Sequence, residues 1–114
     1  MPYIHTVTNQ TVTKDKEIAL KEALGKAIEC IPGKTQEWLM LALEDGVRMA
    51  FRGDENTPLA MIEVEILGKA SNEAYDALTR AITECVNEIL GIPGEGIYIK
   101  YEEIEHWGYN GFNF

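Results

Sequence analysis

Basic residues are scarce in this sequence of 114 residues: ten Lys and Arg stand against nineteen Asp and Glu, which leaves a formal net charge of -9. Nucleic acids and anionic membranes are bound through basic faces, so this charge balance argues against both as partners. No apolar run approaches the ~18 residues that a membrane-spanning helix needs. The start, Met1 to His5, also has neither the basic nor the apolar region of a signal peptide. We therefore expect a cytoplasmic protein.

Cysteine is scarce as well. Cys30 and Cys85 lie singly within helical patterns and form no C-x-x-C motif. They also have no metal-ligand spacing with His5 or His106. We interpret both as small buried side chains in a reducing compartment, and we expect neither a metal nor another cofactor.

The residues that are present indicate a folded domain. Hydrophobic residues make up 46% of the chain and charged residues 25%, which is typical of globular proteins. A chain of this length can bury enough surface for one core, so residues 1–114 are expected to form a single domain.

The first half of the chain reads as strand, helix, strand. Pro2 to Thr8 is rich in β-forming residues and is followed by a turn signal. A helix is predicted next, with Thr13 as its N-cap and Pro32-Gly33 at its end. Its apolar residues recur at spacings of three and four: Leu20, Ala23, Leu24, Ala27, Ile28 and Ile31. Trp38 to Leu43 is apolar on both faces, which is typical of a central buried strand, and Val47 to Phe51 forms a second short run.

The second half repeats this plan. Leu59 to Leu67 alternates between apolar and mixed positions, an apolar helical stripe follows, and Ile97 to Tyr101 is again a strand pattern. Ile31-Pro32-Gly33 recurs as Ile92-Pro93-Gly94, 61 residues later, and the same offset aligns 3–8 with 64–69. The fold class predicted is α/β, with two β-α-β units. Each unit has parallel strands, and the two units form a four-stranded sheet with both helices on one face.

The other face of this sheet has a mixed composition. It combines apolar and charged side chains: Met61, Leu67 and Tyr98 with Glu63, Glu65, Lys100 and Glu102. A fully solvated face would not need the apolar members, and a dry one could not hold the charges unpaired. The pattern favours a hydrated interface between copies of the chain.

Two residues could carry chemistry. Pro2 follows the initiator methionine, and removal of Met1 would expose a secondary amine whose pKa burial or a nearby cation would lower, making it a general base. Lys34 follows the helix-ending Pro-Gly, at an edge where α/β sheets commonly bind ligands. Simpler explanations exist for both: many proteins begin Met-Pro, and a surface lysine often interacts with a helix C-terminus.

Aromatic residues could supply the walls of a pocket. Trp38 and Tyr98 lie in strand patterns, where aromatic residues are usually core. Trp107 and Tyr109 lie in a glycine-rich tail where no core pattern requires them, which favours a pocket or an interface.

Short motifs along the whole chain resemble the tautomerase superfamily, and within it the macrophage migration inhibitory factor and D-dopachrome tautomerase family. They are Met1-Pro2, Gly33-Lys34, Leu67-Gly68-Lys69, Tyr98-Ile99-Lys100-Tyr101 and Gly108-Tyr109-Asn110.

The resemblance implies a homotrimer with active sites between subunits. Pro2 would be the general base of a keto–enol tautomerase that acts on phenylpyruvate-like α-keto acids. Lys34 and the backbone N–H of Leu67 would bind the carboxylate. The ring would lie among Trp38, Tyr98 of an adjacent subunit, Trp107 and Tyr109.

Three differences from the family pattern qualify this expectation. Lys100 stands where the mammalian cytokine has an asparagine that meets the distal hydroxyl of the substrate. The preferred substrate is then more acidic, or the distal contact is absent. Tyr109 stands where relatives often have tryptophan, and the C-x-x-C motif of the cytokine is replaced by Leu59-Ala60-Met61-Ile62.

The resemblance is also compatible with functions besides this tautomerase. The main one is that of a secreted signalling protein that mimics a host cytokine, has a cell-surface receptor and shows little or no tautomerase activity. A hydroxymuconate isomerase or a dehalogenase would fit as well, although these enzymes tend to add arginines to the site. A structural trimer with no turnover is the remaining possibility.

Overall fold

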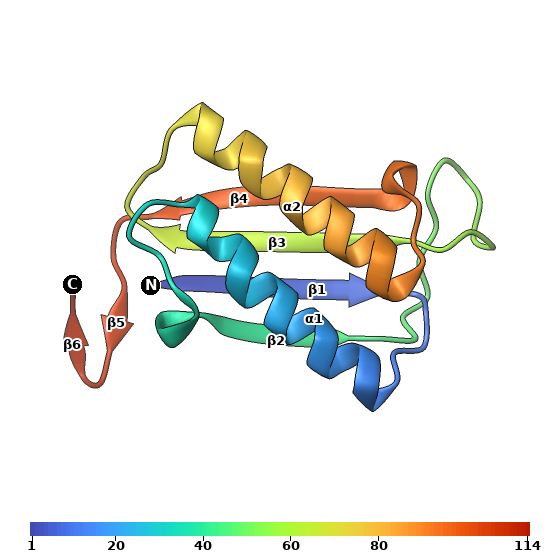
Figure 1. Cartoon of the computed structure of the whole chain (residues 1–114), viewed down its shortest axis with the longest axis horizontal. Coiled ribbons are helices and arrows are strands. Elements are labelled where there is room, and N and C mark those ends of the chain that lie inside the picture. Colours follow the sequence, from blue (N-terminus) through green and yellow to red (C-terminus); the bar gives the residue numbers. More distant parts are fainter.

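The computed structural model describes all 114 residues and contains one main sheet with the strand order β2-β1-β3-β4 (Figure 1). The four strands are β1 (Pro2–Thr8), β2 (Met40–Glu44), β3 (Ala60–Leu67) and β4 (Ile97–Ile104). β1 pairs with β2 and β3 pairs with β4 in parallel, whereas β1 and β3 are antiparallel. The predicted pair of β-α-β units is therefore confirmed.

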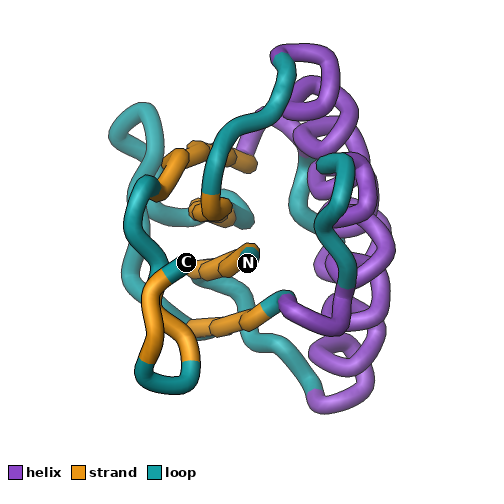
Figure 2. The backbone as a smooth tube through the Cα atoms, turned by 90° about the vertical axis from the view of Figure 1, so that its left-hand side faces the viewer, coloured by secondary structure: helices purple, strands orange, loops and turns teal.

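Both helices cover the same face of this sheet (Figure 2). α1 (Lys14–Ala27) begins at Thr13, whose hydroxyl accepts a hydrogen bond from the N–H of Lys16, as the sequence predicts. α2 (Asn72–Leu90) begins in the same way at Ser71. Three short 3-10 turns complete the helical elements: η1 (Ile28–Cys30), η2 (Gln36–Trp38) and η3 (Gly94–Gly96). None of the helices has both the length and the apolar character needed to cross a membrane.

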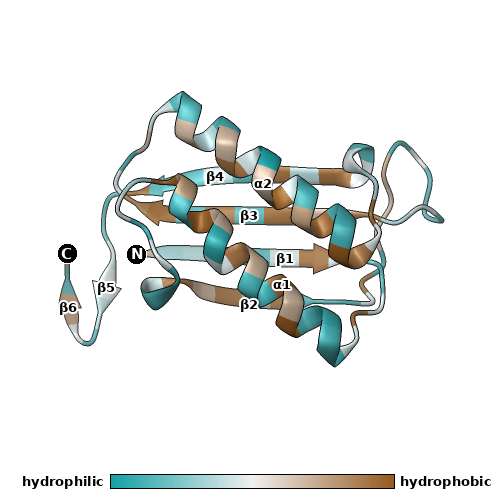
Figure 3. Ribbon diagram, in the orientation of Figure 1, coloured by the Kyte–Doolittle hydropathy of each residue, from teal (hydrophilic) through white to brown (hydrophobic).

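The core lies between the sheet and the two helices. Apolar residues recur along the strands and along both helices (Figure 3). Burial alternates residue by residue along β1 and β3, so every second side chain packs against the helices. The fully buried members come from both layers: Ile4, Ile62, Val64 and Ile66 from the strands, and Ile28, Leu78, Ile82 and Val86 from the helical layer. Burial of these branched side chains, each worth about 1.5–3 kcal/mol, holds the helices on one face only.

The internal repeat is real, but its offset differs from the sequence-based expectation. An offset of 61 would align buried Thr8 with exposed Lys69, and therefore the inner face of one strand with the outer face of the other. The buried positions agree at an offset of 58, which pairs Ile4 with Ile62, and the helix caps Thr13 and Ser71 obey the same offset. The Ile-Pro-Gly motifs lie 61 residues apart and not 58 because α2 is five residues longer than α1. The three residues of η1 separate α1 from Ile31, whereas Gly91 alone separates α2 from Ile92, which reduces the difference to three.

The prediction of a central strand at Trp38 to Leu43 is wrong. Trp38 ends the η2 turn, and β2 forms an edge of the sheet beside β1. The second short run, Val47 to Phe51, adds no strand to the sheet, and its only bridge joins Phe51 to Asp54. Apolar side chains on the outer face of β2, above all Met40 at 69% exposure, account for the misleading pattern.

The open face of the sheet carries a row of polar and charged side chains, one from each strand. Glu44 of β2 pairs with His5 of β1, at 2.5 Å between Oε2 and Nε2. His5 also lies 3.6 Å from Glu63 of β3, which pairs with Lys100 of β4 at 3.3 Å between Oε2 and Nζ. The face is polar in the middle, as its mixed composition predicts.

A small hairpin of β5 (Gly108–Tyr109) and β6 (Phe112–Asn113) ends the chain. It lies beside the N-terminus, at the end of the sheet where β1 begins (Figure 1). This edge therefore brings together the two chain ends and the loop that leads into β2.

Candidate active site

Pro2 begins β1 and is buried, with Ile66 of β3 as its register partner. The preceding residue, Met1, lies beyond the last paired residues of β1 and β3. Its carbonyl oxygen accepts a hydrogen bond from the backbone N–H of Leu67 at 3.0 Å. The first peptide unit of the chain therefore occupies the donor that the family resemblance assigns to the substrate carboxylate.

Lys34 reaches the same place from the loop between η1 and η2. Gly33 precedes it with a φ of 82°, a left-handed conformation that favours glycine and lets the chain turn back after Pro32. The Lys34 ammonium donates a hydrogen bond to the carbonyl oxygen of Leu67 at 3.0 Å. Burial, and then the charge and hydrogen bonding of Lys34, lower the pKa of the N-terminal amine of Met1 from its usual value.

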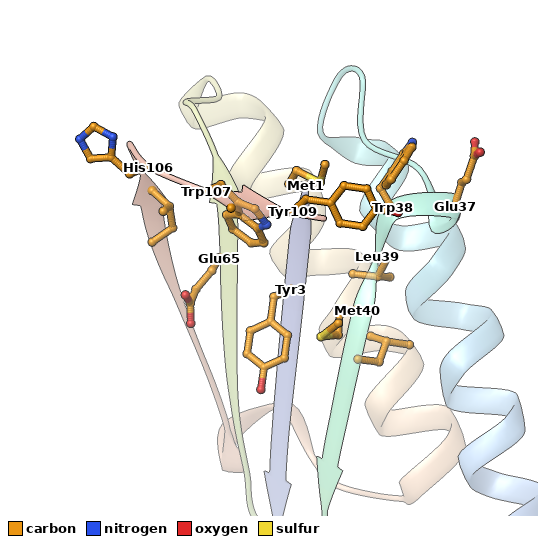
Figure 4. A pocket seen from close by; sticks show the side chains of 13 residues that line it. Met1, Tyr3, Glu37, Trp38, Leu39, Met40, Glu65, His106, Trp107 and Tyr109 are labelled. Atoms are coloured by element: carbon orange, nitrogen blue, oxygen red, sulfur yellow. The ribbon is translucent and has the colours of Figure 1, made fainter. Parts of the chain in front are cut away.

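A pocket of about 840 Å³ opens next to this amine (Figure 4). Trp38, Trp107 and Tyr109 form aromatic walls around it, and Met1 is also part of its lining. The rings of Trp38 and Tyr109 meet edge to face, with centroids 5.3 Å apart. Both side chains are half-exposed, so the structure presents them to the pocket and not to the core.

Several lining residues are not predicted by the sequence. Tyr3, Met40 and Glu65 enter from the open face of the sheet, and Glu37 and His106 flank the two tryptophans. Strand alternation places Glu65 on the same face as Leu67, and this is the one sequence signal that could have identified it. Glu37 and His106 lie in a short turn and in a loop, where no periodicity predicts side-chain direction.

Tyr98 and Lys100 lie away from this pocket within a single chain. Tyr98 is the register partner of Met61 and Lys100 that of Glu63, whereas the Pro2 end of the sheet pairs Leu67 with Ile104. Tyr98 instead meets the ring of Phe51 at 4.9 Å between centroids and is 61% exposed. One chain therefore gathers six of the predicted residues at one end of the sheet: Pro2, Lys34, Leu67, Trp38, Trp107 and Tyr109. It leaves Tyr98 near the opposite end of β4 and Lys100 in the middle of that strand.

Nothing in the arrangement of side chains resembles a metal centre, because no three His, Cys, Asp or Glu residues gather in a suitable group. The chemistry available at the pocket is that of a partly desolvated amine with the Lys34 ammonium beside it, a backbone N–H and aromatic walls.

The fold and the residues at this edge of the sheet define a protein of the tautomerase superfamily. The chain belongs to the macrophage migration inhibitory factor family, because the sequence model described as "Macrophage migration inhibitory factor (MIF)" matches residues 1–114. The resemblance seen in the sequence is thereby confirmed.

Known relatives agree with this assignment. The MIF-like protein mif-2 of Caenorhabditis elegans is 28% identical over 107 residues, which cover 91% of this chain and 85% of the relative. The crystal structure of MIF2 from Leishmania major superposes with a TM-score of 0.92 at 30% identity, over 100% of this chain and 97% of that one. A homologue from Prochlorococcus marinus gives 0.88 at 28% identity, over 98% of both chains.

Proposed function

We propose that the protein is a cofactor-free keto–enol tautomerase of phenylpyruvate-like α-keto acids, with the secondary amine of Pro2 as its general base. The observation that carries this proposal is the position of Met1, whose carbonyl oxygen accepts the N–H of Leu67 while its amine lies near Lys34. Removal of Met1 would free the proline nitrogen, the Leu67 donor and the space beside the Lys34 ammonium in a single step.

The lowered pKa of the Met1 amine supports Pro2 as a base. The same causes, burial and the Lys34 cation, would act on a proline amine exposed at this position. Both disfavour the protonated form, so the amine would be neutral and able to accept a proton near neutral pH. A positioned base of this kind contributes typically 10²–10⁴-fold to the rate.

The remaining groups would bind different parts of the substrate. Lys34 and the Leu67 N–H would hold the carboxylate and stabilise charge that develops on the neighbouring oxygen, where preorganised donors are most effective. Trp38, Trp107 and Tyr109 would hold the aromatic ring and thereby fix the acidic carbon next to the proline nitrogen.

A complete site would need a second copy of the chain. Tyr98 and Lys100 lie away from Pro2 in one protomer, on a sheet face that combines exposed apolar residues with a charged row. We propose a homotrimer in which each pocket receives Tyr98 and Lys100 from a neighbouring subunit. We further propose that the enzyme works in the cytoplasm.

The test compares enol–keto conversion of phenylpyruvate by the wild-type protein and by Pro2→Gly, with the N-terminus of each confirmed by intact mass. We expect mature wild type to lack Met1. Pro2→Gly should lose roughly 10²–10⁴-fold in kcat/KM while it keeps the wild-type melting temperature within a few degrees. Full activity in protein that retains Met1 would rule out the proline mechanism.

A further inference from the structure

The charges around the pocket have an uneven distribution. Among the thirteen residues that line it there is no Lys or Arg, whereas Glu37 and Glu65 are both present. The basic groups among the lining residues are the N-terminal amine of Met1 and the imidazole of His106. Lys34 lies just outside the lining, beside that amine, and donates to the Leu67 carbonyl. The pocket is therefore positive where the carboxylate of a keto acid would bind and negative along its walls.

Neither glutamate carboxylate has a partner within the chain. Neither takes part in an ion pair or donates or accepts a hydrogen bond through its side chain. Glu65 is half-buried on β3, beside Tyr3 of β1 in the ladder, and Glu37 is exposed on the outer side of Trp38 (Figure 4). A half-buried carboxylate is screened less by salt than an exposed one. The charge of Glu65 should therefore act on a bound ligand more strongly than the charge of Glu37.

The lysine that could offset this charge is already paired. Lys100 lies 3.3 Å from Glu63, which faces it across the β3–β4 ladder. If a neighbouring subunit brought this part of β4 to the pocket, it would bring a near-neutral ion pair and not a free cation. The sequence leaves two roles open for Lys100: it selects a more acidic substrate, or the distal contact to the substrate is absent. The pairing with Glu63 favours the second role.

We propose that the pocket selects aromatic 2-oxo acids whose ring carries a basic, protonated substituent, and that Glu65 is the residue that sets this preference. The proposal rests on the tautomerase function proposed above and names its substrate class. The substrate carboxylate would bind at Lys34, the ring would lie between the aromatic walls, and the ring ammonium would face Glu65. An aromatic 2-oxo acid with a second carboxylate would meet like charge in the same place.

Three ligands of the same shape class test this inference: phenylpyruvate, 4-(aminomethyl)phenylpyruvate and 4-carboxyphenylpyruvate. The quantity measured is the ratio of kcat/KM for the ammonium substrate to that for the carboxylate substrate, at low ionic strength. We expect this ratio to exceed one in the wild type and to fall about three- to thirtyfold in Glu65→Gln, the range of a partly exposed to partly desolvated charge contact. Added salt should reduce it.

Glu88→Gln is the matched control, because Glu88 is an exposed residue of α2 and the substitution changes net charge by the same amount. It should leave the ratio at the wild-type value. A wild-type ratio below one, which means a preference for the carboxylate substrate, overturns the inference. If Lys100→Asn then raises the ratio above one, that preference is due to Lys100. If the ratio falls equally in Glu65→Gln and Glu88→Gln, the preference reflects net charge alone. That result would also overturn the inference.

Failure of the proposed function gives a different result. An enzyme that does not convert phenylpyruvate refutes the tautomerase proposal whatever the charge of the ring. In that case the dissociation constants of the same three acids, measured by calorimetry, decide the charge preference. Tighter binding of the ammonium compound, lost in Glu65→Gln, would support the role of Glu65 as a binding residue, and the opposite order would refute it.

Discussion

Trp38 and Tyr109 lie 71 positions apart in the sequence, and their rings meet edge to face with planes at 89° and centroids 5.3 Å apart. Trp38 ends the η2 turn and Tyr109 belongs to the C-terminal hairpin, so the contact joins the two segments that form the pocket wall. The pair connects the middle of the chain to its end at the wall of the pocket.

The first prediction concerns this pair. Trp38→Ala should raise KM for phenylpyruvate roughly two- to tenfold, because an edge-to-face contact contributes about 0.5–1.5 kcal/mol beyond its buried area. The free energy of unfolding should change by less than about 1 kcal/mol, since the ring is 45% exposed. Steady-state kinetics and urea unfolding measure the two effects. Tyr109→Phe keeps the ring edge and is the control. A loss of several kcal/mol in Trp38→Ala would instead make Trp38 a core residue.

A second prediction concerns Lys34. Lys34→Ala should raise KM for phenylpyruvate because the substrate carboxylate loses its cation. The Lys34 charge lowers the pKa of the N-terminal amine, so its removal should raise that pKa and move the acid limb of the kcat/KM profile to higher pH. Lys26→Ala, at the exposed last turn of α1, removes the same charge elsewhere and should leave the profile unchanged. An acid limb that stays in place or moves to lower pH would show that Lys34 does not act on the base.

A third prediction tests whether sites are shared between subunits. Lys34→Ala and Tyr98→Ala homo-oligomers should each be impaired, but mixing them under conditions that allow subunit exchange should restore part of the activity. Recovery is expected because a Tyr98→Ala chain still supplies an intact Lys34, while a neighbouring Lys34→Ala chain supplies an intact Tyr98. Light scattering of the wild type should give the mass of a trimer. Activity in a monomer, or no recovery on mixing, would contradict a shared site.

A fourth prediction concerns stability at alkaline pH. Tyr75 of α2 donates a hydrogen bond to Glu103 at 2.7 Å, and burial together with this carboxylate raises the pKa of its phenol from 10.0 to about 12. The folded state therefore holds this proton over a range where the unfolded chain releases it. The resulting stabilisation is complete below pH 10 and is lost as the pH rises toward 12.

Urea unfolding at a series of pH values measures this effect. Tyr75→Phe lacks the phenol, so its free energy of unfolding should decline less steeply between pH 10 and 12 than that of the wild type. Some decline should persist, because burial also raises the pKa of Tyr101, which hydrogen-bonds to Thr79 on α2. Equal slopes for wild type and Tyr75→Phe would show that the Tyr75 phenol has no part in alkaline unfolding.

The layered architecture could be predicted from the sequence because burial repeats with the period of each element. Alternation along β3 and the capping hydroxyl of Thr13 are local signals, and both are seen in the structure. The offset of the repeat could not be obtained from a turn motif such as Ile-Pro-Gly. A helix can lengthen by a turn without moving the strands, so buried positions such as Ile4 and Ile62 give the better alignment.

The candidate site could be predicted only in part. Met40 and Leu41 make β2 look central, because the side chains that point away from the helices are as apolar as those that point toward them. An interface between chains produces the same pattern as an interior, and sequence periodicity does not distinguish the two. Alternation along β3 places Glu65 on the same face as Leu67, but nothing in the sequence links it to a pocket, and Glu37 in a short turn has no periodic signal at all. Isolated carboxylates look like ordinary solvated residues until the pocket is known.

The two ends of the chain lie close together at the pocket edge, as both views of the backbone show (Figures 1 and 2). This proximity affects how the protein can be handled. A purification tag or fluorescent fusion at the N-terminus would block the proline, and one at the C-terminus would extend from Phe114, whose N–H bonds to the carbonyl of Trp107 beside the pocket. Surface attachment is better made through the exposed loop at 52–57, which lies at the opposite end of the sheet (Figure 1). The proposed tautomerase activity is therefore best assayed on protein that carries no tag at either end.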